Sequence, residues 1–186
     1  NALNGNVDWA TYIGFADGSS GIYEIFDSSA NLQIIGATRS VNFPMINAFQ
    51  PIKLGLNDGI YIVMPKTGNG FLRTSYFGNE GQERIFKARI NNNTLILGGE
   101  YSISAASVKP GIWRINLSNN SISKTYFNFD MDIQPFAYPD TFGNVFFCGL
   151  HSNSNGQAIV STPGAYQETP TAYTTSFLLK YNQNDV

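Results

Sequence analysis

A short pattern recurs three times in this chain of 186 residues, and it constrains the fold more than any other feature. The copies are Thr11-Tyr12-Ile13-Gly14, Ser75-Tyr76-Phe77-Gly78 and Thr125-Tyr126-Phe127-Asn128. After each copy comes an apolar segment that ends at a glycine: Ile34-Ile35-Gly36, Ile96-Leu97-Gly98 and Phe147-Cys148-Gly149. This periodicity predicts an array of similar units, because a single unit of this size cannot bury its apolar faces alone.

Apolar residues occur in short runs broken by Asn, Gly, Asp and Pro, which is typical of strands and turns rather than helices. The predicted strands are 9–14, 22–27, 32–39, 59–64, 71–77, 84–90, 94–101, 111–117, 122–128, 133–138, 144–150 and 176–181. Tips rich in Asn and Gly, such as 65–70 and 116–120, suit tight hairpins because these residues tolerate positive φ.

Counted along the chain, the predicted strands fall into groups of three, four, four and one. Four antiparallel strands in about 50 residues are the pattern of a β-propeller blade. We therefore expect an all-β fold: a β-propeller-like array of four-stranded antiparallel blades, about three repeats over residues 1–186, with units at 8–68, 69–120 and 121–185. Such an array is expected to be open or part of a larger propeller. The alternative is a small or oligomeric ring in which the last strand completes the first group.

Several segments resemble the SBBP-type β-propeller repeat of secreted bacterial proteins. Residues 7–14 are similar to its Trp-x-Thr-Tyr-x-Gly opening, and residues 27–40 to the stretch that ends Gly-x-Thr-x-Ser. Residues 162–167 resemble its Pro-Gly-Ala-aromatic-Gln element, which the middle copy lacks, and 176–182 resemble its Phe-Leu-x-Lys-aromatic-Asn strand. The resemblance implies an extracellular or cell-surface protein of Bacteroidetes-like bacteria, often exported by type IX secretion.

Charge and hydropathy limit the partners. The net charge is −2, from 11 basic and 13 acidic residues, and no run of either sign occurs. Nucleic-acid binding needs a concentrated basic surface, so we expect no nucleic-acid partner. No apolar run approaches the roughly 20 residues of a membrane-spanning helix. Because no signal peptide is recognisable, we interpret the chain as a mature secreted protein or a portion of one.

The residues that usually carry catalysis are sparse. His151 is the single histidine, and no Gly-x-Ser-x-Gly turn is present to expose a nucleophilic serine. Asp130 and Asp132 form the best carboxylate pair, but two acids alone are a weak signal for glycoside hydrolysis or calcium binding. Cys148 lies in an apolar run and is expected to be a buried core residue. We therefore expect no catalytic site, no metal and no cofactor.

Two long segments, 41–58 and 151–175, interrupt the repeat where the middle copy has only 102–110. Extra length at a fixed point of a repeat predicts loops on one face, and such loops often bind ligands. The candidate binding residues are Tyr166, Tyr173, Phe49 and His151. The remaining prominent aromatics are expected to pack between blades: Trp9, Trp113, Tyr12, Tyr76 and Tyr126.

These observations favour a non-enzymatic extracellular module for protein binding, adhesion or scaffolding. The expected partner is another protein or the rest of a longer propeller chain. A carbohydrate-binding module that uses loop aromatics is the alternative, with glycan as its ligand.

Overall fold

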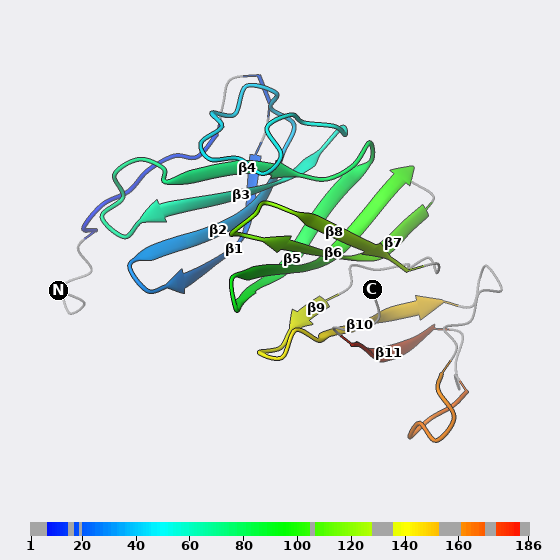
Figure 1. Ribbon diagram of the computed structural model, residues 1–186. Helices are drawn as coiled ribbons and strands as arrows, with labels where there is room; N and C mark the ends of the chain where they lie inside the picture. The colour runs from blue at the N-terminus through cyan, green and yellow to red at the C-terminus, as the bar shows by residue number, and fades with distance from the viewer. Residues whose placement is uncertain are drawn as a thin grey trace.

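The computed structural model describes residues 7–14, 17–18, 20–104, 107–127, 136–152, 161–169 and 174–182. These residues form only β-structure (Figure 1). The strands are β1 (Ser20–Ser28), β2 (Asn31–Thr38), β3 (Asp58–Pro65), β4 (Arg73–Phe77), β5 (Gln82–Asn91), β6 (Thr94–Ser104), β7 (Ser107–Asn116), β8 (Ile122–Tyr126), β9 (Phe136–Pro139), β10 (Val145–Ser152) and β11 (Thr174–Tyr181).

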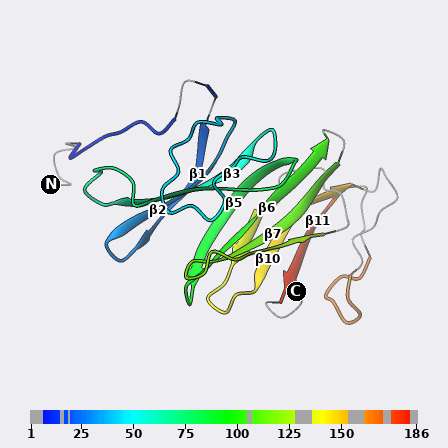
Figure 2. The same cartoon turned by 45° about the horizontal axis from the view of Figure 1, so that its top comes forward.

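The strands form three antiparallel sheets that follow one another along the chain (Figures 1 and 2). Sheet 1 has the order β1-β2-β3-β4, sheet 2 the order β5-β6-β7-β8, and sheet 3 the order β11-β10-β9. The all-β prediction is confirmed, as are antiparallel sheets of three or four strands. The described strands do not form a closed ring.

Two features of the predicted strand pattern are wrong. Residues 9–14 are described outside any strand. The sheets contain four, four and three strands instead of groups of three, four, four and one, because residues 9–14 are no strand and each of the first two sheets ends at its Tyr-aromatic strand, β4 or β8. The boundaries between the predicted units, at 68/69 and 120/121, accordingly fall inside sheets 1 and 2.

Matching β-bulges set the register of sheets 1 and 2. In β1 the extra residue is Tyr23, opposite the Ile35–Gly36 step of β2, and in β5 it is Phe86, opposite Gly98–Gly99 of β6. A Cβ added to Gly36 or Gly99 would collide with a carbonyl oxygen of the bulged strand, so each position requires glycine. The structural equivalent of Gly36 is therefore Gly99 and not Gly98.

Two apolar clusters stack the sheets on one another. The first lies between sheets 1 and 2 and includes Tyr61, Phe77 and Trp113, whose side chains are almost completely buried. The second lies between sheets 2 and 3 and includes Ile112 and Phe147. Because both faces of the central strands are covered, β3 is a continuous apolar run instead of an alternating one.

A third cluster covers the other face of sheet 1. It contains Ile60, Ile62 and Tyr76 from β3 and β4, and Phe43 from the β2–β3 connection. Ile13 of the N-terminal segment packs against it. We call this surface the leading face of sheet 1.

Three packing predictions are wrong. Cys148 is exposed, because alternate residues of β10 face opposite sides and only the side of Val145 and Phe147 meets sheet 2. Tyr12 is fully exposed, and Trp9 is exposed beside the β3–β4 turn, because residues 9–14 join no described sheet. Two of the other aromatics pack between sheets as expected: Trp113 is buried, and the ring of Tyr126 lies 5.8 Å from that of Trp113. Tyr76 is buried too, but on the leading face of sheet 1 against Phe43 of the β2–β3 loop, not between two described sheets.

Backbone hydrogen bonds also connect the first two sheets. The amide of Glu83 donates to the carbonyl of Asn57 at 2.9 Å, and the amide of Leu56 donates to the carbonyl of Gly81 at 3.0 Å. Between sheets 2 and 3, the described hydrogen bonds come from arginine side chains, as from Arg114 to the carbonyl of Gly143 at 3.4 Å.

Candidate functional site

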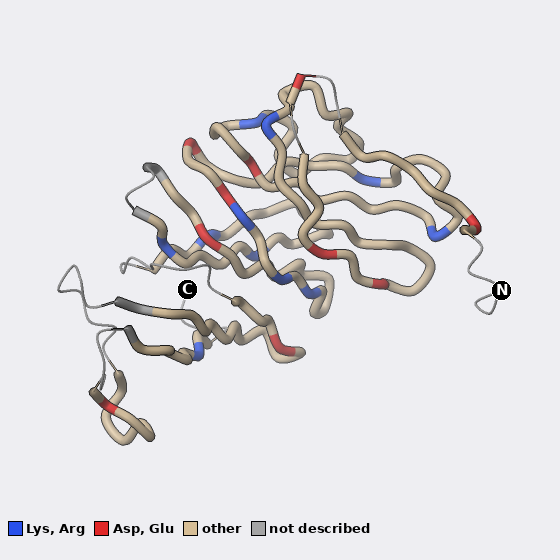
Figure 3. Tube along the Cα trace, turned by 180° about the vertical axis from the view of Figure 1, so that it is seen from behind, with Lys and Arg blue, Asp and Glu red and all other residues tan. Residues whose placement is uncertain are grey.

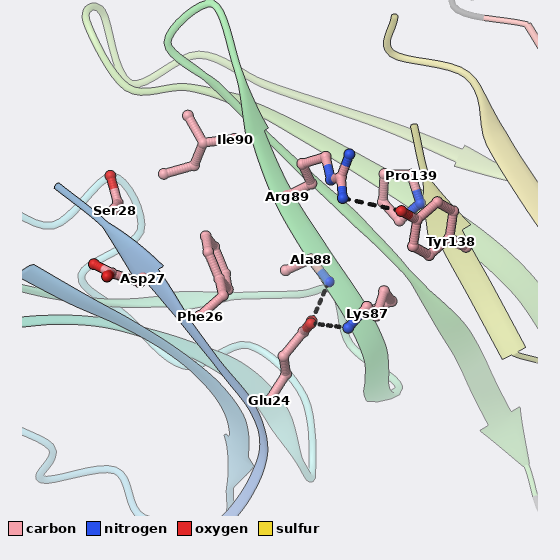
Figure 4. A pocket seen from close by; sticks show the side chains of 10 residues that line it. All are labelled: Glu24, Phe26, Asp27, Ser28, Lys87, Ala88, Arg89, Ile90, Tyr138 and Pro139. Atoms are coloured by element: carbon pink, nitrogen blue, oxygen red, sulfur yellow. Dashed lines mark hydrogen bonds and ion pairs between the residues drawn. The ribbon is translucent and has the colours of Figure 1, made fainter. Parts of the chain in front are cut away.

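The first strands of the three sheets lie side by side, with β5 between β1 and β9. A cavity of about 360 Å³ opens along them (Figure 4). Its walls carry four charged side chains, Glu24, Asp27, Lys87 and Arg89, together with the ring of Tyr138. Charged groups gathered around one cavity are candidates for acid–base chemistry.

The charged groups of this cavity already have partners in the protein, and Asp27 pairs with Lys66 at 2.6 Å. Glu24 forms an ion pair with Lys87 and accepts a hydrogen bond from the amide of Ala88. Arg89 donates to the Tyr138 hydroxyl at 3.0 Å, and its guanidinium lies 5.2 Å from the centre of that ring. A general acid or base needs a proton-transfer partner in a substrate, and these groups already have partners in the protein. These interactions link β1, β5 and β9 to one another.

A second hollow, of about 480 Å³, is lined by Tyr23, Arg84, Phe86 and Phe136. Tyr23 and Phe86 are the two bulge residues, so the bulges turn an aromatic ring from each of two sheets toward the same space. Arg84 bonds Glu100 at 3.2 Å. Aromatic rings beside an arginine can stack on apolar ligand surfaces and bind polar groups at their edge. We call this the aromatic hollow.

The β2–β3 connection, residues 39–57, is the longest loop described in full, and it is held rigidly. Asp58 lies at its end and accepts hydrogen bonds from the amides of Leu54 at 2.8 Å and Gly55 at 2.7 Å. The backbone of Gln50 makes two hydrogen bonds to β4. Its amide donates to Ser75 Oγ at 2.9 Å, and its carbonyl accepts from the amide of Tyr76 at 3.1 Å. These hydrogen bonds tie both the middle and the end of the loop to β3 and β4.

The outer surface of that loop is apolar. Ile52, Leu54 and Leu56 are 68%, 53% and 60% exposed, and they alternate along the segment. Lys53 between them bonds the carbonyl of Gly55 instead of extending into solvent. Large aliphatic side chains on a rigid, exposed loop are unusual on an isolated surface and mark interaction sites. We call these three side chains the loop patch; the loop lies above β4 in Figure 1.

Two carboxyl groups meet beneath the loop, between sheets 1 and 2. Glu83 is fully buried; its Oε1 accepts from the amide of Asn79 at 2.9 Å, while Oε2 has no hydrogen-bond partner among the described residues. Burial, with the charge of Asp58 adding to it, raises the pKa of Glu83 to about 8. Burial also raises the pKa of Asp58. Neither Glu83 nor Asp58 lines the two cavities described above.

The residues predicted to bind a ligand are scattered. Phe49 is partly buried and stacks on Tyr61 at 6.0 Å between ring centres, which gives the ring a packing role. Tyr166 is 106% exposed in the segment 161–169. His151 lies in β10, but its side chain, like all of Tyr173, is outside the described residues, as are Asp130 and Asp132. The aromatic hollow was not predicted. The loop patch lies in segment 41–58, which was predicted to carry binding, but its three aliphatic residues were not named.

Charges of both signs are interspersed over the part of the chain that the structure describes (Figure 3). Within that part, no three His, Cys, Asp or Glu side chains come together as a metal site would require. The described residues also include no helix with the length and apolar character needed to cross a membrane.

No protein-family model matches the chain, and a search of curated proteins finds no related sequence. The resemblance to the SBBP-type repeat therefore stays a prediction from the motifs.

Proposed function

We propose that the three sheets are consecutive blades of an open or larger β-propeller that works as a non-enzymatic, extracellular protein-binding module of a bacterial surface or secreted protein. The loop patch supports the binding role most directly. Its aliphatic side chains are exposed on a backbone fixed by Gln50 and Asp58, so a partner would bury apolar area without having to order the loop. The low charge of the chain suits such a surface, since interface cores are poor in charged residues.

The test is a cross-linking capture of secreted and surface proteins from the source culture. The triple variant Ile52→Ser, Leu54→Ser and Leu56→Ser is compared with the wild type and with Phe142→Ser, which removes an exposed apolar side chain from the β9–β10 turn. We expect one protein to be captured by the wild type and by the control but lost with the triple variant. Circular dichroism should show the same melting temperature for all three proteins. Capture that survives the triple substitution would contradict the proposal.

The aromatic hollow supports a second candidate function, glycan binding. Sugars present apolar ring faces that stack on aromatic side chains, and hydroxyl groups that arginine can bond. A glycan array with the wild type, Tyr23→Ala, Phe136→Ala and, as control, Tyr166→Ala tests it. Binding that Tyr23→Ala and Phe136→Ala abolish supports the hollow. An array without signal removes glycan as a ligand, and a signal sensitive only to Tyr166→Ala moves the site to segment 161–169.

A further inference from the structure

A lysine and an asparagine meet where sheet 1 passes into sheet 2. Lys124 lies in the middle of β8, and Asn79 lies in the connection between β4 and β5. The Nζ atom of Lys124 donates to the carbonyl of Gly78 at 2.5 Å and also to Oδ1 of Asn79. Both side chains are partly buried. A primary amine is therefore in direct contact with a side-chain amide inside the protein.

The side-chain amide of Asn79 has a partner on each side. Its Nδ2 donates to the hydroxyl of Tyr126 at 2.8 Å, while its Oδ1 accepts from Lys124. The backbone amide of the same residue donates to Oε1 of Glu83 at 2.9 Å. Because Cγ lies only one C=O bond, about 1.23 Å, behind Oδ1, the hydrogen bond brings Nζ close to Cγ. Reacting atoms must approach to roughly 3–3.5 Å, and this contact is near that range.

Aromatic rings stand beside the contact. The ring of Tyr126 stacks on that of Tyr101 with 4.5 Å between ring centres, and it lies edge-on to Trp113 at 5.8 Å. Burial raises the pKa of Tyr126, so its hydroxyl stays uncharged. Surroundings of this kind hydrate charged groups poorly and favour the uncharged forms of an amine or a carboxyl group.

Glu83 supplies a buried carboxyl group next to the pair. Its Oε2 has no hydrogen-bond partner among the described residues, and it lies 2.5 Å from the position of a Cβ added to Gly78, whose carbonyl binds Lys124. Burial raises the pKa of Glu83 to about 8. Burial also lowers the pKa of Lys124, against the opposing charges of Glu83 and Asp58. The two shifts favour transfer of a proton from the ammonium group to the carboxylate, which leaves both uncharged.

We propose that Lys124 and Asn79 form an intramolecular isopeptide bond, with Glu83 as the proton acceptor. Nζ gives one proton to the carboxylate and attacks Cγ as an uncharged amine, so that a C–N bond forms and one electron pair of the C=O bond moves onto Oδ1. A second proton passes from Nζ to Nδ2. The bond from Cγ to Nδ2 then breaks, its electron pair leaves with the nitrogen as ammonia, and the C=O bond forms again. Nothing is oxidised or reduced.

The bond joins the beginning of sheet 2 to its end. Asn79 comes just before β5, the first strand of the sheet, and Lys124 belongs to β8, the last one. The two residues are 45 positions apart, so the bond closes a loop that contains three whole strands and part of the fourth. A covalent link across a loop of this length restricts the unfolded chain, as a disulfide does.

Mass spectrometry of the intact, denatured chain measures the bond. We expect a mass about 17 Da below that of the sequence, because one ammonia is lost. Trypsin should release a branched peptide that joins 74–84 to 115–180, since the modified Lys124 is no longer cleaved. Lys124→Arg and Asn79→Ala should keep their full masses. Lys66→Arg is the matched control and should still lose ammonia, because Lys66 contacts Asp27 in an exposed position.

Glu83→Gln tests the proton acceptor. It leaves both reacting side chains in place and keeps an oxygen that can accept from the Asn79 amide, but it removes the carboxylate. Circular dichroism checks that the variant is folded. We expect a folded chain of full mass, which separates the chemistry of Glu83 from any effect on folding.

A wild-type chain that keeps its full mass after days in the folded state at neutral pH would overturn the proposal. So would a loss of ammonia that persists in Lys124→Arg, because it would assign the loss to succinimide formation at an Asn-Gly step such as Asn69-Gly70. If Glu83→Gln forms the branched peptide as completely as the wild type, the role of Glu83 as proton acceptor is wrong.

Discussion

The hydroxyl of Tyr76 donates a hydrogen bond of 2.9 Å to the carbonyl of Ser40, and so ties the centre of β4 to the beginning of the β2–β3 loop. The same hydroxyl accepts from the amide of Phe43 at 3.2 Å. One side chain thus organises both the leading face of sheet 1 and the loop that carries the candidate binding patch.

Two substitutions at Tyr76 should distinguish the packing of its ring from the hydrogen bonds of its hydroxyl. Tyr76→Ala is expected to lower the free energy of unfolding by roughly 3–5 kcal/mol, because it leaves a cavity at a site that is only 1% exposed. Tyr76→Phe keeps the ring and should cost about 1–2 kcal/mol, since it leaves the Phe43 amide and the Ser40 carbonyl without this partner. Urea unfolding measures both values. Tyr166→Ala serves as control and should change stability by less than about 0.5 kcal/mol.

Gly99→Ala tests the bulge that sets the register of sheet 2. Its Cβ would meet the carbonyl oxygen of Arg84, and the backbone has no flexible end that can move aside. We expect a loss of about 1–3 kcal/mol in thermal or urea unfolding. Gly14→Ala is the matched control, because nothing lies within 4 Å of its Cβ position. Equal effects at the two glycines would show that the close approach at Gly99 is not maintained in solution.

The buried carboxyl of Glu83 predicts a pH dependence. Its pKa rises from 4.5 to about 8 on folding, so the folded protein keeps a proton that the unfolded chain releases. The stabilisation is present below pH 4.5 and is lost as the pH rises toward 8, by at most about 1.4 kcal/mol per pH unit. In Glu83→Gln the free energy of unfolding should depend less on pH between 4.5 and 8 than in the wild type. Urea unfolding at several pH values measures this dependence for both proteins. Identical slopes for the two proteins would mean that Glu83 ionises normally.

Phe49 was predicted to bind a ligand, and the structure stacks its ring on that of Tyr61. Phe49→Ala should therefore lower stability, by about 1–3 kcal/mol for a partly buried ring. The Phe49→Ala variant should still capture a partner through the loop patch when the assay is run at a low temperature, at which the destabilised protein stays folded. An unchanged free energy of unfolding together with lost capture would instead indicate that Phe49 contacts the partner directly, as the sequence predicted.

Much of the fold follows from local sequence. Asn92 and Asn93 close the β5–β6 hairpin with φ of 43° and 66°, the positive values that an Asn-rich tip predicts. Eleven of the predicted strands are present. The apolar runs between such turns are too short to form helices, so they bury their side chains as strands of a sheet. Residues 9–14 have the same pattern but pair with no described strand, and the pairing partner of a strand is not encoded in the segment itself.

The candidate surfaces were harder to predict, for a physical reason. A bulge adds one residue to one strand, and its signal is the glycine on the opposite strand. The pair Gly98-Gly99 offers two choices, and choosing the first shifts every side chain of β6 to the opposite face. With Gly99 aligned to Gly36, Tyr23 and Phe86 become equivalent and the aromatic hollow could have been foreseen. The loop patch depends on Gln50 and Asp58 being buried, which the loop sequence alone does not reveal.

The backbone bridge from Asn57 to Glu83 has a consequence for how the protein opens. Sheets 1 and 2 share main-chain hydrogen bonds and an apolar cluster, whereas the contacts described between sheets 2 and 3 are made by side chains. Local opening follows the number of such restraints. Amides of β10 and β11 should exchange with deuterium through a lower-energy opening than those of β3 and β6, so the chain would come apart from its C-terminal sheet inward.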